Sequence, residues 1–168
     1  MRNDTCRALV INPTAAALSN YGTLLMTRGN NQEAQLLFKQ AIAMDPRHEH
    51  ALLNYATLAA QWGRDYSLAE ALLQRAIIAH PASVIGLTNL GQLYAHILRK
   101  TVEAEALLHR ALTANSLAAP ALLSLGWIFE QQGEVAKARC MYRRALLADP
   151  TLRPPIHDRT ALSIRIVH

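Results

Sequence analysis

Fourfold internal repetition constrains the fold of this chain more than any other feature. The Asn-Tyr-Gly segment at 20–22 recurs in altered form at 54–56, 89–91 and 124–126, so the spacings are 34, 35 and 35 residues. A fixed period of this length is typical of proteins that stack one small structural unit. We therefore expect four copies of a single supersecondary unit.

Further positions repeat together with this segment. A leucine stands two residues before each copy, and the second half of each unit carries a small residue, a large apolar residue, an alanine, and a proline or serine. A pattern that returns four times in the same order is not a chance similarity. The repeating positions are Leu18, Leu52, Leu87 and Leu122; Ala34, Ala69, Ala104 and Ala138; Phe38, Leu73, Leu108 and Tyr142; Ala41, Ala76, Ala111 and Ala145; and Pro46, Pro81, Ser116 and Pro150.

The spacing of apolar residues predicts two helices in each unit. Apolar side chains follow one another at steps of three and four, which is the pattern of an amphipathic helix. Proline ends the second helix because it lacks a backbone N–H and disfavours the helical conformation in the residue before it. We expect first helices at 15–28, 49–62, 84–98 and 119–132, and second helices at 32–44, 67–79, 102–114 and 135–148.

Small residues in the middle of the first helices predict close helix packing. Two helices approach to about 8–10 Å only when the side chains at the contact allow it. We expect the alanines that begin the second helices to face these small residues, which are Gly22, Ala56, Gly91 and Gly126. Repeats two and three each carry one extra residue, which we expect in the turn between the helices, and Leu98 replaces the turn glycine in repeat three.

Composition excludes several other classes of protein. Hydrophobic residues make up 51% and aromatic residues 5% of the chain, which fits neither a disordered chain nor an ordinary β-sandwich. The net charge of +5 is milder than the basic stripe of a dedicated nucleic-acid-binding protein. Cys6 and Cys140 fit no metal or redox spacing, so we expect a reducing intracellular compartment, cytoplasmic or organellar. The start of the chain has no long apolar core, so we expect no secretory signal. No apolar run is long enough for a membrane span.

The repeated positions resemble those of the tetratricopeptide repeat family. The first helix contributes the Leu, the Tyr/Leu-Gly/Ala pair and a later aromatic or leucine, and the second contributes Ala, Phe/Tyr/Leu, Ala and Pro. The resemblance implies an all-α, right-handed superhelical solenoid of helix-turn-helix hairpins that recognises other proteins and has no catalysis of its own. The expected segments are 1–13 as the end of a partial preceding repeat, 14–46, 47–81, 82–116 and 117–150 as repeats one to four, and 151–168 as a capping or partner-binding tail.

Superhelical stacking of such hairpins puts the first helices on the concave side. The lining of that groove is expected to be polar and almost uncharged. The candidate partner-binding residues are Asn20, Thr23, His50, Asn54, Thr57, Asn89, Gln92, His96, Trp127 and Glu130. The wider lining is expected to include Ala16, Ser19, Thr27, Leu53, Gln61, Ile85, Thr88, Leu123, Ser124 and Gln131.

Asn20, Asn54 and Asn89 occupy the same position in three successive repeats. Asparagine is a mediocre helix former, so its repetition needs a reason. One interpretation is a ladder of amides that pair with the backbone of an extended peptide. The other is a structural role at the repeat junction. Trp127 is an alternative apolar anchor in repeat four, and is equally consistent with a partly buried position.

A basic cluster on the last predicted helix consists of Lys137, Arg139, Arg143 and Arg144. Residues 139 and 143 share one face of the helix, as do residues 137 and 144 two turns apart. A solvated outer face is the simpler interpretation, and a patch for an acidic partner is the alternative. Cys140 lies in the same helix, and we expect a buried or inert thiol.

No constellation of residues indicates catalysis. The seven histidines are scattered, and the sequence contains no phosphate-binding glycine loop, zinc spacing or nucleophile elbow. We therefore predict no enzyme activity, catalytic residue, metal site or cofactor. An RNA-binding helical-repeat protein is a weaker rival, since such repeats are also about 35 residues long.

The predicted function is a protein-interaction scaffold or adaptor. Its expected partner is an extended peptide or a partner subunit in the groove. The alternative is a permanently assembled subunit of a large complex, held by its ends and convex face. Residues 6–13 echo residues 142–150, so the start resembles the end of a second helix whose hairpin is missing, which leaves apolar surface in need of cover.

Overall fold

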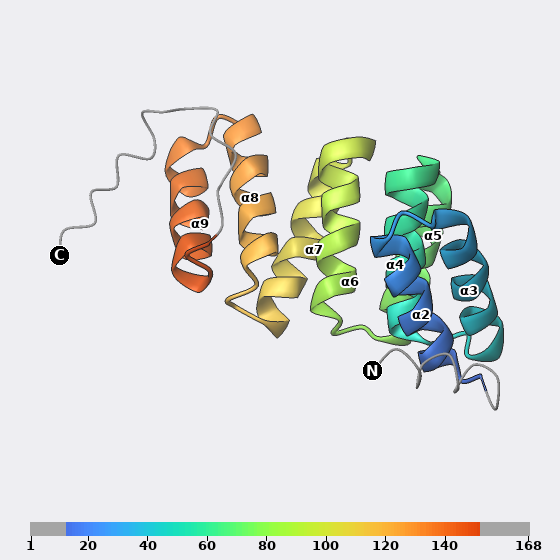
Figure 1. Cartoon of the computed structure of the whole chain (residues 1–168). Coiled ribbons are helices and arrows are strands. Elements are labelled where there is room, and N and C mark those ends of the chain that lie inside the picture. The colour runs from blue at the N-terminus through green and yellow to red at the C-terminus, as the bar shows by residue number, and fades with distance from the viewer. Residues whose placement is uncertain (1–12, 152–168) are drawn as a thin grey trace. The chain divides into compact units, whose positions relative to one another are not determined.

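The computed structural model describes residues 13–151, and every regular element in this range is helical. Of the predicted partial repeat at 1–13 and the predicted capping segment at 151–168, residues 1–12 and 152–168 lie outside the described residues. The elements are α2 (Ala15–Thr27), α3 (Asn31–Met44), α4 (Glu49–Leu58), η1 (Ala59–Gly63), α5 (Tyr66–Ala79), α6 (Val84–Gln92), η2 (Leu93–Leu98), α7 (Thr101–Ala114), α8 (Ala119–Gln131) and α9 (Val135–Ala148) (Figure 1).

The helical hairpins predicted from the sequence are confirmed. Each observed helix begins and ends within about one residue of its expected bounds. Helix α2 packs on α3, α4 on α5, and α8 on α9, while η2 packs on α7 (Figure 1). The fold class is therefore all-α and built from helix-turn-helix units.

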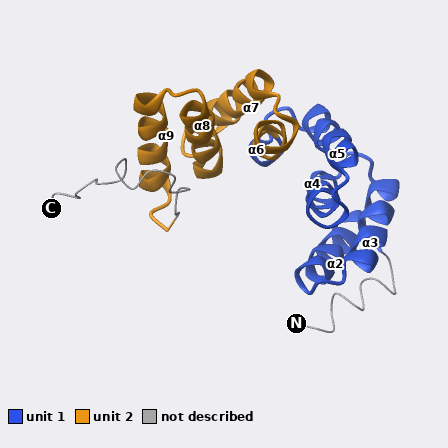
Figure 2. Cartoon of the chain, turned by 90° about the horizontal axis from the view of Figure 1, so that it is seen from above, with its two compact units in different colours: residues 1–86 blue, residues 87–168 orange. Residues whose placement is uncertain are grey.

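The chain divides into two compact units, residues 1–86 and 87–168 (Figure 2). In the first unit α3 also packs against α4 and α2 contacts α4, so two successive hairpins share a core. In the second unit α7 packs against α8 in the same manner. Sharing of this kind is what a hairpin needs, because one pair of helices cannot bury both of its faces.

The repeating positions form the core. Phe38, Leu52, Leu108 and Leu122 have no exposed surface. In the first unit the rings of Phe38 and Tyr55 stack with centroids 6.5 Å apart, which joins the second helix of one repeat to the first helix of the next. Large apolar side chains at a fixed repeat position therefore bury surface between neighbouring hairpins.

The glycines make room for large side chains of the second helix. A Cβ atom on Gly22 would lie 2.8 Å from Cε1 of Phe38, and one on Gly91 would lie 2.8 Å from Cγ of Leu108. The expectation that the alanine position faces the glycines is incomplete. The nearest atoms belong to the residue one turn later, which is long enough to fill the space, and the backbone oxygen of Ala104 lies farther away, at 3.5 Å from a Cβ on Gly91.

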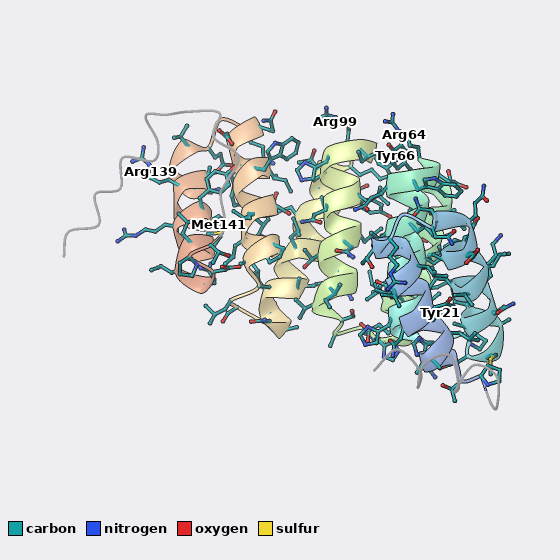
Figure 3. All side chains as sticks on the ribbon, viewed as in Figure 1. Tyr21, Arg64, Tyr66, Arg99, Arg139 and Met141 are labelled. Carbon is teal, nitrogen blue, oxygen red and sulfur yellow. The ribbon has the colours of Figure 1, made fainter. Side chains whose placement is uncertain are left out.

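The extra residue of repeats two and three lies in the first helix and not in the turn. There the last turn is π-helical, as η1 and η2, whereas α2 and α8 stay α-helical to their ends. A π turn absorbs one inserted residue while the flanking helix keeps its packing. The left-handed residue that follows is Arg64 (φ 50°) or Arg99 (φ 56°), where repeats one and four have Gly29 and Gly133 (Figure 3).

Helices α3 and α7 end in the same way, although a proline follows only α3. Asp45 accepts a hydrogen bond from the N–H of Arg47 (3.0 Å), and Asn115 accepts one from Leu117 (3.0 Å). Helix α7 therefore ends at Ala114 although Ser116 replaces the proline. The short polar side chain directly after the last helical residue forms a local turn that competes with continuation of the helix.

Candidate functional site

The first helices of the first unit, α2 and α4, expose a polar surface. Asn20 and His50 are exposed, and Thr23, Asn54 and Thr57 are half-buried. Asn54 donates a hydrogen bond from Nδ2 to Oγ1 of Thr23 (2.8 Å), and Thr23 donates from Oγ1 to the carbonyl of Ser19 (2.9 Å). The amide of Asn54 therefore links two successive repeats through a hydroxyl that is itself fixed by its own helix.

The first helices of the second unit repeat this arrangement with different residues. Gln92 on α6 donates from Nε2 to Oγ of Ser124 on α8 (3.1 Å), and Ser124 donates to the carbonyl of Pro120 (2.8 Å). Gln92 occupies the repeat position of Thr23, and Ser124 occupies that of Asn54. The same two positions are thus hydrogen-bonded across a repeat junction in both units, with donor and acceptor exchanged.

An aromatic pair lies on the same side of the second unit. The rings of His96 on η2 and Trp127 on α8 have centroids 4.2 Å apart and are tilted by 56°. Partial burial, followed by the charge of Arg99, holds the pKa of His96 below its usual value. This shift favours the neutral imidazole of His96, and the half-buried Trp127 leaves part of its side chain exposed.

Glu130 shares this surface and also supports the hairpin. Its Oε2 accepts a hydrogen bond from the hydroxyl of Tyr142 on α9 (2.8 Å). The carboxylate is half-buried. A charged acceptor makes a stronger hydrogen bond than a neutral one, so this contact fixes α9 against α8 beside the candidate surface.

Four positions expected in the wider lining are buried, and that part of the prediction is wrong. Ser19, Leu53, Thr88 and Ser124 expose 1%, 4%, 5% and 3% of their surface. Three of them, Ser19, Leu53 and Thr88, share one repeat position, which turns toward packed neighbours. The hydroxyls of Ser19 and Thr88 have no hydrogen-bond partner among the residues described.

At the asparagine position the side chain has a structural role in one repeat, and a binding role in the other two stays a prediction. Asn54 is used at the repeat junction, as the second interpretation of the sequence expected. Asn20 is exposed and Asn89 is half-buried. The three asparagines are therefore not equivalent, although they are identical in type and register.

The basic cluster on α9 divides into two faces. Lys137 pairs with Glu134 at 2.5 Å, and Arg144 donates a hydrogen bond to the carbonyl of Ser116 (3.3 Å). Arg139 and Met141 project to different sides of the helix (Figure 3). Cys140 is exposed, so the buried alternative for this thiol is wrong, and the inert alternative stays a prediction.

Within 13–151 no group of three or more His, Cys, Asp or Glu side chains is arranged to hold a metal ion. In the same range no helix has both the length and the apolar character that a membrane crossing requires.

Comparisons with known proteins agree with the repeat pattern. Residues 5–98 match the family model described as the cilia and flagella-associated protein 70 middle TPR-like domain. Residues 98–152 match the model of the tetratricopeptide repeat. The comparison with curated proteins gave no significant match.

Solved structures of similar fold share little sequence with this chain. PilF of Pseudomonas aeruginosa is 21% identical with a TM-score of 0.74, over 82% of this chain and 62% of that one. A chain of the APC/C hetero-tetramer Cut9–Hcn1 is 18% identical with a TM-score of 0.80, over 90% and 29%. YrrB is 18% identical with a TM-score of 0.72, over 89% and 77%.

This chain spans only part of several similar proteins, 62% of PilF and 56% of a tetratricopeptide repeat protein from Parabacteroides merdae. The first family model covers more than half of the chain, and the second continues it to the end of the fourth repeat. The hairpins, the repeat positions and both models lead to one conclusion: the chain belongs to the tetratricopeptide repeat family.

Proposed function

We propose that this protein is a non-catalytic interaction scaffold that binds an extended peptide or a partner subunit on its first-helix surfaces. These surfaces are the outward sides of α2 and α4 in the first unit, and of α6, η2 and α8 in the second. The observation that carries the proposal is their chemistry. In both units amide, hydroxyl and imidazole groups gather on the first helices, where they can donate to and accept from a peptide backbone.

The hydrogen bonds within each unit support this role by holding donors and acceptors in place. The half-buried amides of Asn54 and Gln92 are each held by a hydrogen bond to a hydroxyl of the neighbouring repeat. Side chains held in this way lose little further conformational entropy when a partner binds. The pair of His96 and Trp127 adds an aromatic surface, and tryptophan is enriched among residues that dominate binding energy.

Two proteins of similar fold have a described partner or a site for one. YrrB is described as having an unusual peptide-binding site, and Cut9–Hcn1 is a hetero-tetramer. At such low sequence identity the similarity shows the fold alone, so the partner of this chain must be identified by experiment. A protein partner, rather than a metabolite, is the class that this surface chemistry suits.

The test begins with a pull-down by the full chain, followed by cross-linking from defined positions. A photoreactive residue at Asn20, on the first-helix surface, should form an adduct with the retained partner. The same residue at Lys39, exposed on the second helix α3, serves as the matched control. Adducts from Lys39 and none from Asn20 would place the partner on the opposite side and contradict the proposal.

Affinity then identifies the contributing side chains. With the purified partner, Trp127→Ala should weaken binding by about tenfold or more, and Asn20→Ala with Asn89→Ala by about twofold to tenfold per hydrogen bond. Lys39→Ala should leave the affinity unchanged. Unchanged affinity in all first-helix variants would remove the surface from consideration.

A further inference from the structure

A groove on the second unit lies apart from the first-helix surfaces. It has a volume of about 400 Å³ and is formed by the second helices α7 and α9 with a side chain from α8. This volume is within the range of sites that bind small ligands or single peptide side chains. Its lining consists of His109, Leu112, Thr113, Phe129, Lys137, Cys140, Met141 and Arg144.

The chemistry of the groove combines an apolar floor with a basic rim. Leu112, Phe129 and Met141 supply apolar and polarisable surface, and methionine adapts to different shapes. Lys137 and Arg144 stand on α9 two turns apart, and Lys137 also lies over the ring of Phe129 with 5.4 Å from Nζ to the centroid. An apolar side chain can therefore bind in the groove while carboxylates flanking it meet the rim.

Acidic residues near the groove offset the charge of Lys137 but not that of Arg144. Glu134 pairs with Lys137 at 2.5 Å, and Glu105 lies 3.7 Å from His109. Neither glutamate is among the lining residues. Arg144 donates to a backbone carbonyl and to the sulfur of Met141, which keeps its positive charge at the rim. A cation satisfied only by neutral acceptors retains its attraction for a carboxylate.

Charge identifies the kind of occupant. The chain's own C-terminal segment, 151–168, contains three arginines and one aspartate, so its charge opposes binding to a basic rim. A second copy of the chain also carries a net charge of +5. Electrostatic complementarity favours a partner of the opposite sign.

We propose that the groove between α7 and α9 is a docking site for an acidic partner segment that inserts one large apolar side chain, such as leucine or phenylalanine. The site is independent of the first-helix surfaces. The scaffold can then hold two protein segments at once, one on each side of its second unit. The basic residues divide accordingly: Lys137 and Arg144 belong to the site, whereas Arg139 and Arg143 do not line it.

The probe for this site is a synthetic peptide, Glu-Glu-Leu-Phe-Glu-Glu, with Gln-Gln-Leu-Phe-Gln-Gln as its control. Cys140 reports occupancy because it lines the groove and is exposed. In a Cys6→Ser chain the acidic peptide should slow the reaction of Cys140 with a maleimide several-fold, and the glutamine peptide should not. Saturable binding of the acidic peptide without protection of Cys140 overturns the proposal.

Substitutions on one helix separate the groove from general attraction to a basic protein. Arg144→Gln should weaken binding of the acidic peptide by about tenfold, whereas Arg139→Gln should weaken this binding by less than about twofold. Equal losses from both variants overturn the proposal. Because Arg144 also contacts Ser116, Cys140→Trp provides a second variant: it fills the groove from an exposed position and should abolish binding while the far-ultraviolet circular dichroism stays unchanged.

The two other occupants give distinct outcomes. If removal of residues 152–168 raises the reactivity of Cys140 or the peptide affinity by about tenfold or more, the chain's own segment occupies the groove and the proposal is wrong. If the acidic peptide dissociates a dimer detected by sedimentation, a second copy occupies it, with the same consequence. Loss of first-helix binding by Trp127→Ala, with peptide protection of Cys140 retained, shows that the two sites are independent.

Discussion

The hydroxyl of Tyr142 on α9 donates a 2.8 Å hydrogen bond to Oε2 of Glu130 on α8. The ring also occupies the space left by Gly126, since a Cβ atom there would lie 2.6 Å from Cδ1 of Tyr142. Burial of the phenol raises its pKa above the usual value, and the hydrogen bond to Glu130 and its negative charge add to the shift. One tyrosine therefore joins the packing of the last hairpin to the polar surface of its first helix.

The raised pKa predicts a loss of stability in alkali that depends on Tyr142. The unfolded chain releases the phenol proton near pH 10 while the folded chain retains it, so the contribution of this group is complete below about pH 10 and falls as the pH rises further. Tyr142→Phe should melt at a lower temperature at pH 8 and show a shallower decline between about pH 9 and pH 11. The control is Tyr66→Phe, a phenol without a carboxylate partner in the described structure. A Tyr142→Phe chain that declines as steeply as the parent contradicts this account.

Gly126→Leu should destabilise the last hairpin by overpacking. The site has no room for a side chain without displacement of the Tyr142 ring, and overpacking of this kind costs about 1–3 kcal/mol. Gly63→Ala is the matched control, because a Cβ atom at Gly63 would meet nothing within 4 Å. Thermal or urea denaturation measures both variants. Equal melting temperatures for the two would show that the contact of α8 with α9 is wrongly assigned.

Arg64→Gly should stabilise the protein. Arg64 follows the π-helical turn η1 with φ 50° and ψ 25°, in the left-handed region. That conformation costs a residue with a Cβ atom about 1–2 kcal/mol, and the greater freedom of glycine in the unfolded chain returns part of it, so the expected gain is about 0.5–1 kcal/mol. Arg64→Ala removes the same side chain but keeps the Cβ atom, and should give no gain. A gain in the alanine variant would assign the effect to charge instead of backbone conformation.

The sequence predicted the helices well because their determinants are local and repeated. Apolar spacing, the small residue of the first helix and the end of the second helix recur in each unit. The helix bounds in each repeat could therefore be checked against those of the other three. The π turns escaped prediction, because an inserted residue changes the repeat length without showing where the helix absorbs it. The spacing from Ala56 to Ala69 is one residue longer than that from Gly22 to Ala34, and this was the available signal.

The candidate site was predicted less completely, since side-chain partners depend on the neighbouring repeat. Exposure of Asn20 and His50 followed from helical register. Register alone did not reveal that Asn54 donates to Thr23, or that Ser19 and Thr88 are buried. The groove between α7 and α9 combines residues from three helices, and nothing in their spacing along the chain marks it.

Thr88→Val should raise stability, which is unusual for a substitution in a core. The Oγ1 atom of Thr88 is buried and makes no hydrogen bond within residues 13–151. Valine has nearly the same shape and removes the uncompensated hydroxyl, so the free energy of unfolding should increase by about 1 kcal/mol. The control is Thr57→Val, because Thr57 donates to the carbonyl of Leu53 (3.0 Å) and loses a satisfied bond. A decrease in stability for Thr88→Val would mean that the hydroxyl has a partner, for example a bound water.

The hydrogen bond between Asn54 and Thr23 should be measurable as a coupling energy between repeats. Asn54→Ala and Thr23→Ala should each destabilise the chain by about 0.5–1.5 kcal/mol, and the double variant by less than the sum, because each single change removes the same bond. Asn20→Ala is the control: this exposed side chain has no hydrogen bond in the described structure, so its removal should change stability by less than about 0.5 kcal/mol.

The comparison also distinguishes the two roles of the asparagine position. A junction residue lowers stability when it is removed, whereas a residue that only contacts a partner lowers affinity and leaves the melting temperature unchanged. Additive effects of Asn54→Ala and Thr23→Ala would show that the junction does not depend on this bond.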